Sequence, residues 1–221
     1  MANAWMRGIG RVNGKTPGGR PQGGAPRAVW HMSESDPNNL SARSVAQRLD
    51  SDGRTSHLVW NPVTGDTVQL LPATAAAAGQ LTPGLRTDRA REGRVCIVIQ
   101  VVGYSLLPFT DGPLNGLDPI LRWLDSWEIP RWWPAGPPAP FPASHSPSGS
   151  ERLWAQGGHF GHSQVPGSRA DGPGAIDIGR LRGVPLPFPA PGLRSPSATG
   201  PLSRVRPSAN GVRPHAATGP T

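Results

Sequence analysis

Two histidines and one aspartate have the residue types of a metal site. His162 and Asp171 stand nine residues apart in a loop rich in proline and glycine, and His31 ends the apolar run 28–31 far upstream. Imidazole and carboxylate are both zinc ligands, and zinc hydrolases often leave a fourth position open for the water that is activated. A histidine in a loop is more often a surface or capping residue, so this spacing needs support from other motifs.

The elements that must position these residues have recognisable patterns. Segment 94–102 is the most apolar of the chain and has β-branched residues at both parities, as in a central strand covered on both faces. Segments 56–60 and 67–71 predict two hairpin strands, because the connection 61–66 contains the proline and glycine of a turn. Segment 27–31 predicts the first core strand.

Two segments have apolar residues at helical spacing. Segment 39–50 predicts a short helix with Ser41 as a candidate N-cap, and segment 114–127 predicts a second helix that stops before Pro130. The apolar positions are Ala42, Val45, Ala46 and Leu49 in the first helix, and Leu114, Leu117, Ile120, Leu121, Leu124 and Trp127 in the second. We therefore expect an α/β fold, a central sheet with helices packed on it.

The chain of 221 residues suits one domain with a segment on either side. We expect the domain at 27–182. Residues 1–26 are rich in glycine and arginine and aperiodic, which predicts an extended leader lying against the domain. Residues 183–221 lack hydrophobic periodicity, so we expect a disordered tail that cannot bury enough apolar surface to offset its ordering entropy.

The positive charge of the chain is concentrated at its C-terminal end. The formal net charge is +8, and no acidic residue follows Asp177. The arginines after that point are Arg180, Arg182, Arg194, Arg204, Arg206 and Arg213. Such a tail can bind DNA or teichoic acids through non-specific electrostatics. The simpler interpretation is a solvated tail, with a basic nucleic-acid-binding protein as an alternative.

Cys96 is the only cysteine, which excludes an intramolecular disulfide. It lies within the predicted central strand, where a thiol packs as a small hydrophobe. The N-terminus lacks the apolar run of a secretory signal, and no segment has the length needed to span a bilayer. We expect the protein to accumulate in the cytoplasm.

Four segments in order resemble the type-2 N-acetylmuramoyl-L-alanine amidases of high-GC Gram-positive bacteria and their phages, the peptidoglycan-recognition-protein-like family. The segments are 24–31, 56–72, 93–103, and 158–166 together with 173–178. The order of the four motifs gives the resemblance its specificity over about residues 24–182. It implies a mixed β-sheet flanked by helices and zinc-dependent hydrolysis of the amide between muramic acid and L-alanine. The expected partner is peptidoglycan, reached by a monomeric phage or prophage lysin after holin-type release.

The resemblance assigns roles to individual residues. His31 and His162 match the two imidazole ligands of zinc. His57 matches a histidine of the family's Ser-His strand, which implies a supporting or substrate-facing role, with plain packing as the alternative. His159 is not expected to be a ligand, because the glycines around it argue against a helix that would bring it beside His162. The aromatic, proline-rich segment 132–142 is expected either to line a substrate groove or to cover the core.

Two positions depart from the family's pattern. Gln100 stands where the family has a glutamate that deprotonates the zinc-bound water, and an amide cannot accept that proton. Losing a general base typically costs about 10²- to 10⁴-fold in rate. The second departure concerns the third zinc ligand. An ungapped match to the family places Gly172 at the position of this ligand. A slip of one residue instead aligns Asp171 as the ligand and Arg169 as the cation that faces the oxyanion. We expect this slipped arrangement. The alternative is a catalytically impaired module that binds peptidoglycan.

Overall fold

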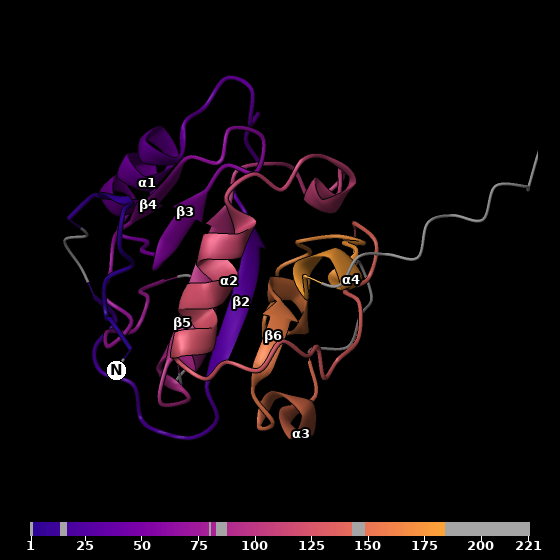
Figure 1. Ribbon diagram of the computed structural model, residues 1–221. Coiled ribbons are helices and arrows are strands. Elements are labelled where there is room, and N and C mark those ends of the chain that lie inside the picture. The colour runs from indigo at the N-terminus through magenta and orange to yellow at the C-terminus, as the bar shows by residue number, and fades with distance from the viewer. Residues whose placement is uncertain (1, 14–16, 80, 83–87, 143–148, 184–221) are drawn as a thin grey trace, which may run out of the picture. The chain divides into compact units, whose positions relative to one another are not determined.

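The computed structural model describes residues 2–13, 17–79, 81–82, 88–142 and 149–183. Within these residues a six-stranded mixed sheet has the order β1-β4-β3-β5-β2-β6 (Figure 1). The strands are β1 (Gly10–Arg11), β2 (Arg27–Met32), β3 (Leu58–Trp60), β4 (Thr67–Gln69), β5 (Cys96–Val101) and β6 (Gly158–Gly161). β3, β5, β2 and β6 run parallel, β4 is antiparallel to β3, and β1 is parallel to β4. This confirms the expected α/β class.

The described part of the chain also contains four α-helices, α1 (Ala42–Ser51), α2 (Leu117–Ser126), α3 (Glu151–Trp154) and α4 (Ile178–Leu181). Three 3₁₀ turns lie at Arg89–Arg91, Phe109–Asp111 and His162–Gln164. The first predicted helix begins later than expected because Ser41 is its N-cap, with a side chain that accepts the Ser44 N–H at 3.1 Å. The second begins at Leu117 because Gly116 is left-handed, with φ of 79°.

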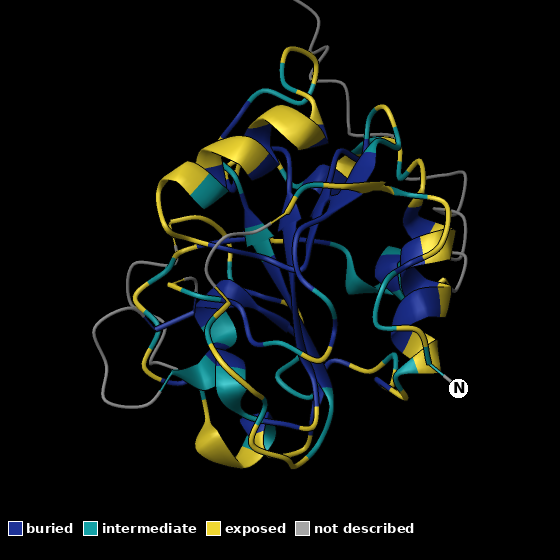
Figure 2. Ribbon diagram, turned by 90° about the vertical axis from the view of Figure 1, so that its left-hand side faces the viewer, coloured by how far each residue is buried: buried dark blue, intermediate teal, exposed yellow. Residues whose placement is uncertain are grey.

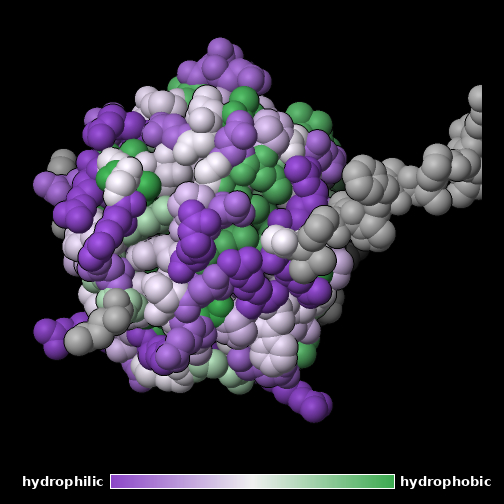
Figure 3. Space-filling model, in the orientation of Figure 1, coloured by the Kyte–Doolittle hydropathy of each residue, from purple (hydrophilic) through white to green (hydrophobic). Residues whose placement is uncertain are grey.

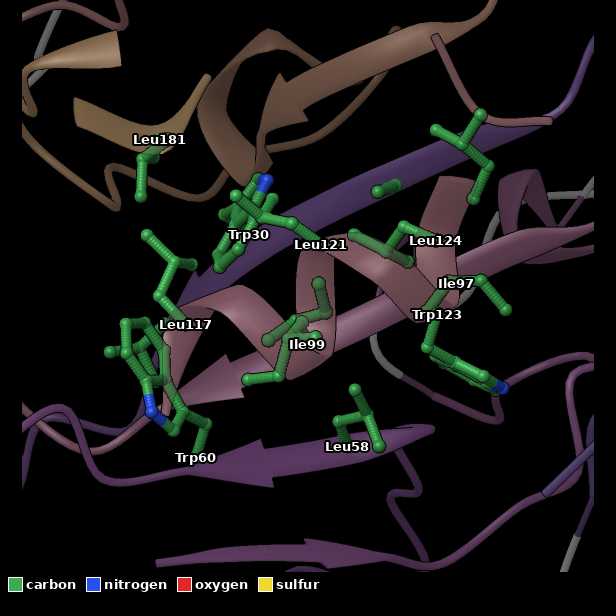
Figure 4. Close-up of a cluster of buried hydrophobic side chains, with 14 of the residues drawn as sticks. Trp30, Leu58, Trp60, Ile97, Ile99, Leu117, Leu121, Trp123, Leu124 and Leu181 are labelled. Carbon is green, nitrogen blue, oxygen red and sulfur yellow. The ribbon is translucent and has the colours of Figure 1, made fainter. Parts of the chain in front are cut away.

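α1 and α2 cover opposite faces of the sheet, since the side chains of each strand alternate between the two. Val29, Val59 and Val98 pack with the apolar side of α1. The other face carries the larger cluster, in which Trp30, Leu58, Trp60, Ile97 and Ile99 meet Leu117, Leu121 and Leu124 of α2 (Figure 4). Burying each such side chain stabilises the fold by about 1.5–3 kcal/mol. Figure 2 shows the strands buried and the outer turns of the helices exposed.

The N-terminal segment packs against the rest of the domain. Met6 is buried in the cluster beneath α2, and its backbone N–H donates to Gln69 Oε1 at 2.7 Å. β1 pairs with β4 at the edge of the sheet. The expected tail lies outside the described residues apart from residue 183. No helix in the described ranges has the length and apolar character needed to cross a membrane.

Candidate functional site

The two histidines that resemble zinc ligands meet at one edge of the sheet. β2 and β6 are parallel neighbours, with Trp30 paired to Gly161, so the residues that follow these two in the chain, His31 and His162, emerge at the same edge. Their ring centroids are 4.2 Å apart, with the planes nearly perpendicular. Because the carboxyl ends of parallel strands are where α/β sheets bind ligands, this pair is the best candidate for a functional site.

Gln100 lies directly beside His31 in the register of β2 and β5. The Nδ1–H of His31 donates to Gln100 Oε1 at 2.8 Å, and the glutamine is buried. An amide oxygen only accepts hydrogen bonds, so this contact places a proton on the Nδ1 of His31.

His162 presents the opposite nitrogen. Its Nε2–H donates to the carbonyl oxygen of Leu81 at 3.0 Å, whereas its buried Nδ1 has no hydrogen-bond partner. Burial lowers the pKa of His162, which keeps the imidazole neutral near pH 7. A neutral histidine that gives its one N–H to a carbonyl and leaves its other nitrogen without a partner has the arrangement of a metal ligand.

Asp171 does not join the two histidines in this conformation. Its side chain is exposed, and the described residues contain no group of three histidine, cysteine, aspartate or glutamate side chains that could hold a metal. Its neighbour Gly172 accepts the Ser163 N–H at 2.8 Å, which ties the loop beside His162. Arg169 is exposed on the same loop. The expected ligand set is therefore brought together only in part.

In the ungapped match the third ligand falls at position 172, where the structure has no room for a side chain. Gly172 is buried, and a Cβ added to it would lie 2.7 Å from Ser105 Oγ and 3.7 Å from Met32 Cγ. Ser105 is itself held by Glu34, whose carboxylate accepts both its N–H and its hydroxyl. An aspartate at position 172 would therefore have to displace this contact.

His57 lies inside the protein, which speaks against the expected contact with substrate. It has no exposed surface, its Nδ1 accepts the Val98 N–H at 3.0 Å, and its Nε2–H donates to the Ala75 carbonyl at 2.9 Å. Burial lowers its pKa to about 4. The geometry fits the alternative of packing, in which a neutral imidazole joins two segments of backbone.

His159 belongs to the core rather than to the histidine pair. Its Nδ1 accepts the indole N–H of Trp30 at 3.0 Å, and its ring lies between Trp30 and Trp133. Burial lowers its pKa to about 3. In the aromatic segment 132–142, Trp133 is buried in the core cluster, as expected of a segment that covers the core, whereas Trp132 is 47% exposed.

Two contributors to this edge were missed by reasoning from the sequence. The Leu81 carbonyl that orients His162 is a backbone group, and no residue type reports such an acceptor. Glu34 follows His31 closely and has an unusual φ of 51°. An acidic residue soon after the histidine strand was the only indication that the sequence offered for it.

Comparisons with known proteins give a distant likeness only. No family model matches the sequence, and no curated protein matches it. A solved selenomethionine derivative of AmpD is 18% identical, with a TM-score of 0.48 over 81% of this chain and 96% of that chain. The endolysin N-acetylmuramoyl-L-alanine amidase LysCS from Clostridium intestinale URNW is 15% identical, with a TM-score of 0.45 over 82% and 99%. The Ph2119 endolysin from the Thermus scotoductus MAT2119 bacteriophage Ph2119 is 15% identical, with a TM-score of 0.43 over 76% and 90%. Likenesses this remote carry no argument about function.

Proposed function

We propose that the protein is a peptidoglycan amidase that hydrolyses the bond between muramic acid and L-alanine. The observation that carries this proposal is the meeting of His31 and His162 at the carboxyl edge of the parallel strands. The ordered motifs of the sequence supply the substrate class. On the same resemblance we propose that the protein is a monomeric lysin of a phage or prophage. Its host would be a high-GC Gram-positive bacterium, and it would reach the cell wall by holin-type release.

Zinc is the metal that suits this pair of ligands. The Nδ1 of His162 has no hydrogen-bond partner, and its imidazole is neutral near pH 7. Each of the two rings gives one N–H to an oxygen of the protein, as histidines do when their other nitrogen binds a metal. When bound, zinc would polarise the amide carbonyl and lower the pKa of a coordinated water. Gln100 orients His31, but its amide cannot take a proton from that water.

The third ligand requires a change in the loop after His162. We propose that Asp171 supplies it and that Arg169 moves with the loop to face the developing oxyanion. Gly167 and Gly174 flank this segment with φ of 77° and 79°. Glycine adopts such positive φ values much more readily than residues that have a Cβ. Glycine therefore permits backbone changes at these two positions that other residues would resist.

A catalytically impaired peptidoglycan-binding module is the second candidate. Two observations favour it, the buried amide of Gln100 beside His31 and the absence of a carboxylate from the histidine pair in the described conformation. Such a protein would hold the muramoyl peptide at the same edge of the sheet but would not cleave it.

The test combines the metal content with the release of L-alanine amino ends from purified cell walls. The proposed amidase contains zinc, releases amino ends in a chelator-sensitive way, and loses both properties in His162→Ala. His57→Gln is the matched control, because a glutamine can keep both backbone hydrogen bonds of that buried histidine. Binding to walls without release selects the impaired module. A folded protein that neither binds nor cleaves walls would overturn both candidates.

A further inference from the structure

A groove beside α2, away from the histidine pair, has the character of a second binding site. It lies between the N-terminal segment and α2, has a volume of about 390 Å³, and shares no residue with the histidine pair. Its lining includes Asn3, Trp5, Arg7, Arg122 and Trp123. We propose that this groove binds an oxyanion, a phosphate or a carboxylate carried on a larger molecule.

The walls of the groove are fixed by hydrogen bonds. The Asn3 carbonyl accepts the indole N–H of Trp123 at 2.8 Å and that of Trp127 at 3.3 Å. The Ala4 carbonyl accepts the Ala73 N–H at 2.9 Å. The N-terminal segment is therefore joined both to α2 and to the loop after β4. A groove held in this way is formed before a ligand arrives, which lowers the entropic cost of binding.

The arginines of the groove are not neutralised by the protein. Arg7 and Arg122 are exposed, and neither makes an ion pair or a hydrogen bond with the described residues. Elsewhere in these residues, Arg27, Arg54, Arg89, Arg94 and Arg131 pair with carboxylates. Two guanidinium groups beside one groove therefore remain available to a ligand.

The neighbouring charges favour an anion. Asp125 forms an ion pair with Arg131 at 2.6 Å. Asp118 lies one turn before Arg122 on α2 and makes no ion pair with Arg122 within 4 Å. The guanidinium of Arg11 lies 4.7 Å from the ring centroid of Trp5 and adds a third positive charge. On the face that α2 covers, hydrophilic residues stand between paler and apolar ones (Figure 3).

The chemistry of arginine defines the ligand class. A guanidinium presents a planar fork of N–H donors that matches two oxygens of a phosphate or a carboxylate. Because the groove is open along the surface, it suits an oxyanion within a chain better than an enclosed small molecule. Phosphate and carboxylate share this chemistry, so the experiment must separate them.

The indole N–H signals of the tryptophans report on this site in the full chain. ¹⁵N-labelled protein is titrated with inorganic pyrophosphate in one series and with citrate in another, at constant ionic strength. The signals of Trp5 and Trp123, assigned with Trp5→Phe and Trp123→Phe variants, should shift and saturate. Arg7→Gln combined with Arg122→Gln should abolish the saturable shift. The control Arg152→Gln, which removes an exposed arginine from α3, should leave it unchanged.

The outcomes decide both the site and its ligand. A shift with pyrophosphate alone assigns a phosphate group, a shift with citrate alone assigns a carboxylate, and shifts with both assign a general oxyanion site. Equal movement of all tryptophan signals, a shift that does not saturate, or an unchanged shift in the double variant would overturn the proposal. These results do not depend on zinc or on cleavage, so failure here is separate from failure of the proposed amidase.

Discussion

Gln100 and His31 lie opposite each other in the register of β5 and β2 and share a hydrogen bond of 2.8 Å. The amide oxygen accepts the Nδ1–H of the imidazole and thereby fixes the orientation of the ring. Gln100 therefore acts on the candidate metal through His31, as a positioning residue. The same side chain cannot serve as a general base, so orientation and proton transfer are separated at this position.

Gln100→Glu tests the lost proton acceptor. A carboxylate keeps the hydrogen bond to His31 and can also take a proton, so the rate of amide hydrolysis should rise by roughly 10²- to 10⁴-fold. The measurement is the release of amino ends from purified walls. An unchanged and already rapid wild-type reaction would show that another group accepts the proton.

Gln100→Leu tests the positioning role separately. Leucine removes the acceptor of the His31 Nδ1–H, and losing the hydrogen-bond partner of a ligating histidine weakens metal binding by about 10- to 100-fold. Competition with a chromogenic zinc chelator measures the affinity, with Gln100→Glu as the matched variant that retains an acceptor. Equal affinities of Gln100→Leu and the wild type would rule out this role.

The sequence predicted the fold best where periodicity was strong. The strand 94–102 was recognised because apolar, β-branched residues fill both parities, and β5 lies between β3 and β2 inside the sheet. β1 was not recognised, because Gly10 and Arg11 have no apolar pattern. That strand forms only because the edge of β4 offers unpaired backbone groups.

The candidate site was predictable only in its side chains. Motif order identified His31 and His162, and the structure brings them together. It could not identify the Leu81 carbonyl, because hydrogen bonds of the backbone leave no trace in residue type. It could not decide the role of His57 either, since a buried neutral histidine and a substrate-facing one have the same sequence context.

Asp171→Ala tests the proposed third ligand. Removing an oxygen ligand should weaken zinc binding by about ten-fold or more, because a catalytic zinc site usually has three protein ligands. Equilibrium dialysis against a zinc buffer measures the change. The control is Asp118→Ala, an exposed aspartate on α2. Equal zinc affinities of the two variants would show that Asp171 is not a ligand, and the site would then consist of the two histidines.

Acid is expected to destabilise the fold through its buried histidines. Burial lowers the pKa of His57 from 6.5 to about 4 and that of His159 to about 3. In the unfolded chain both would be protonated below about pH 6.5, so stability is fully present above that pH and is lost as the pH falls towards the folded pKa values. Each group contributes a slope of about 1.4 kcal/mol per pH unit in this window.

Urea denaturation between pH 5 and pH 7 measures this slope. His57→Gln should reduce it by the contribution of one group, because glutamine can make the same two backbone hydrogen bonds but does not titrate. A slope that is the same in the variant and the wild type would mean that His57 takes up its proton at the same pH in the folded protein as in the unfolded chain.

The hydrogen bond between Trp30 and His159 should contribute a measurable coupling energy. The indole donates to Nδ1 at 3.0 Å between two buried side chains, while the Nε2 of His159 has no partner. Substituting His159 alone removes both the hydrogen-bonded Nδ1, which stabilises the fold, and the unpartnered Nε2, which destabilises it. The effect of this one substitution on stability is therefore ambiguous. A double-mutant cycle cancels the Nε2 contribution, because that atom is lost whether or not Trp30 is present.

The cycle uses Trp30→Phe, His159→Phe and the double variant, with the free energy of unfolding measured in urea. We expect a favourable coupling of about 0.5–3 kcal/mol, the range of residues that share a contact. The control cycle pairs Trp60→Phe with His159→Phe, since the indole of Trp60 donates to Asn115 instead, and its coupling should stay below about 0.5 kcal/mol. Equal couplings in the two cycles would show that the hydrogen bond between Trp30 and His159 contributes no coupling energy.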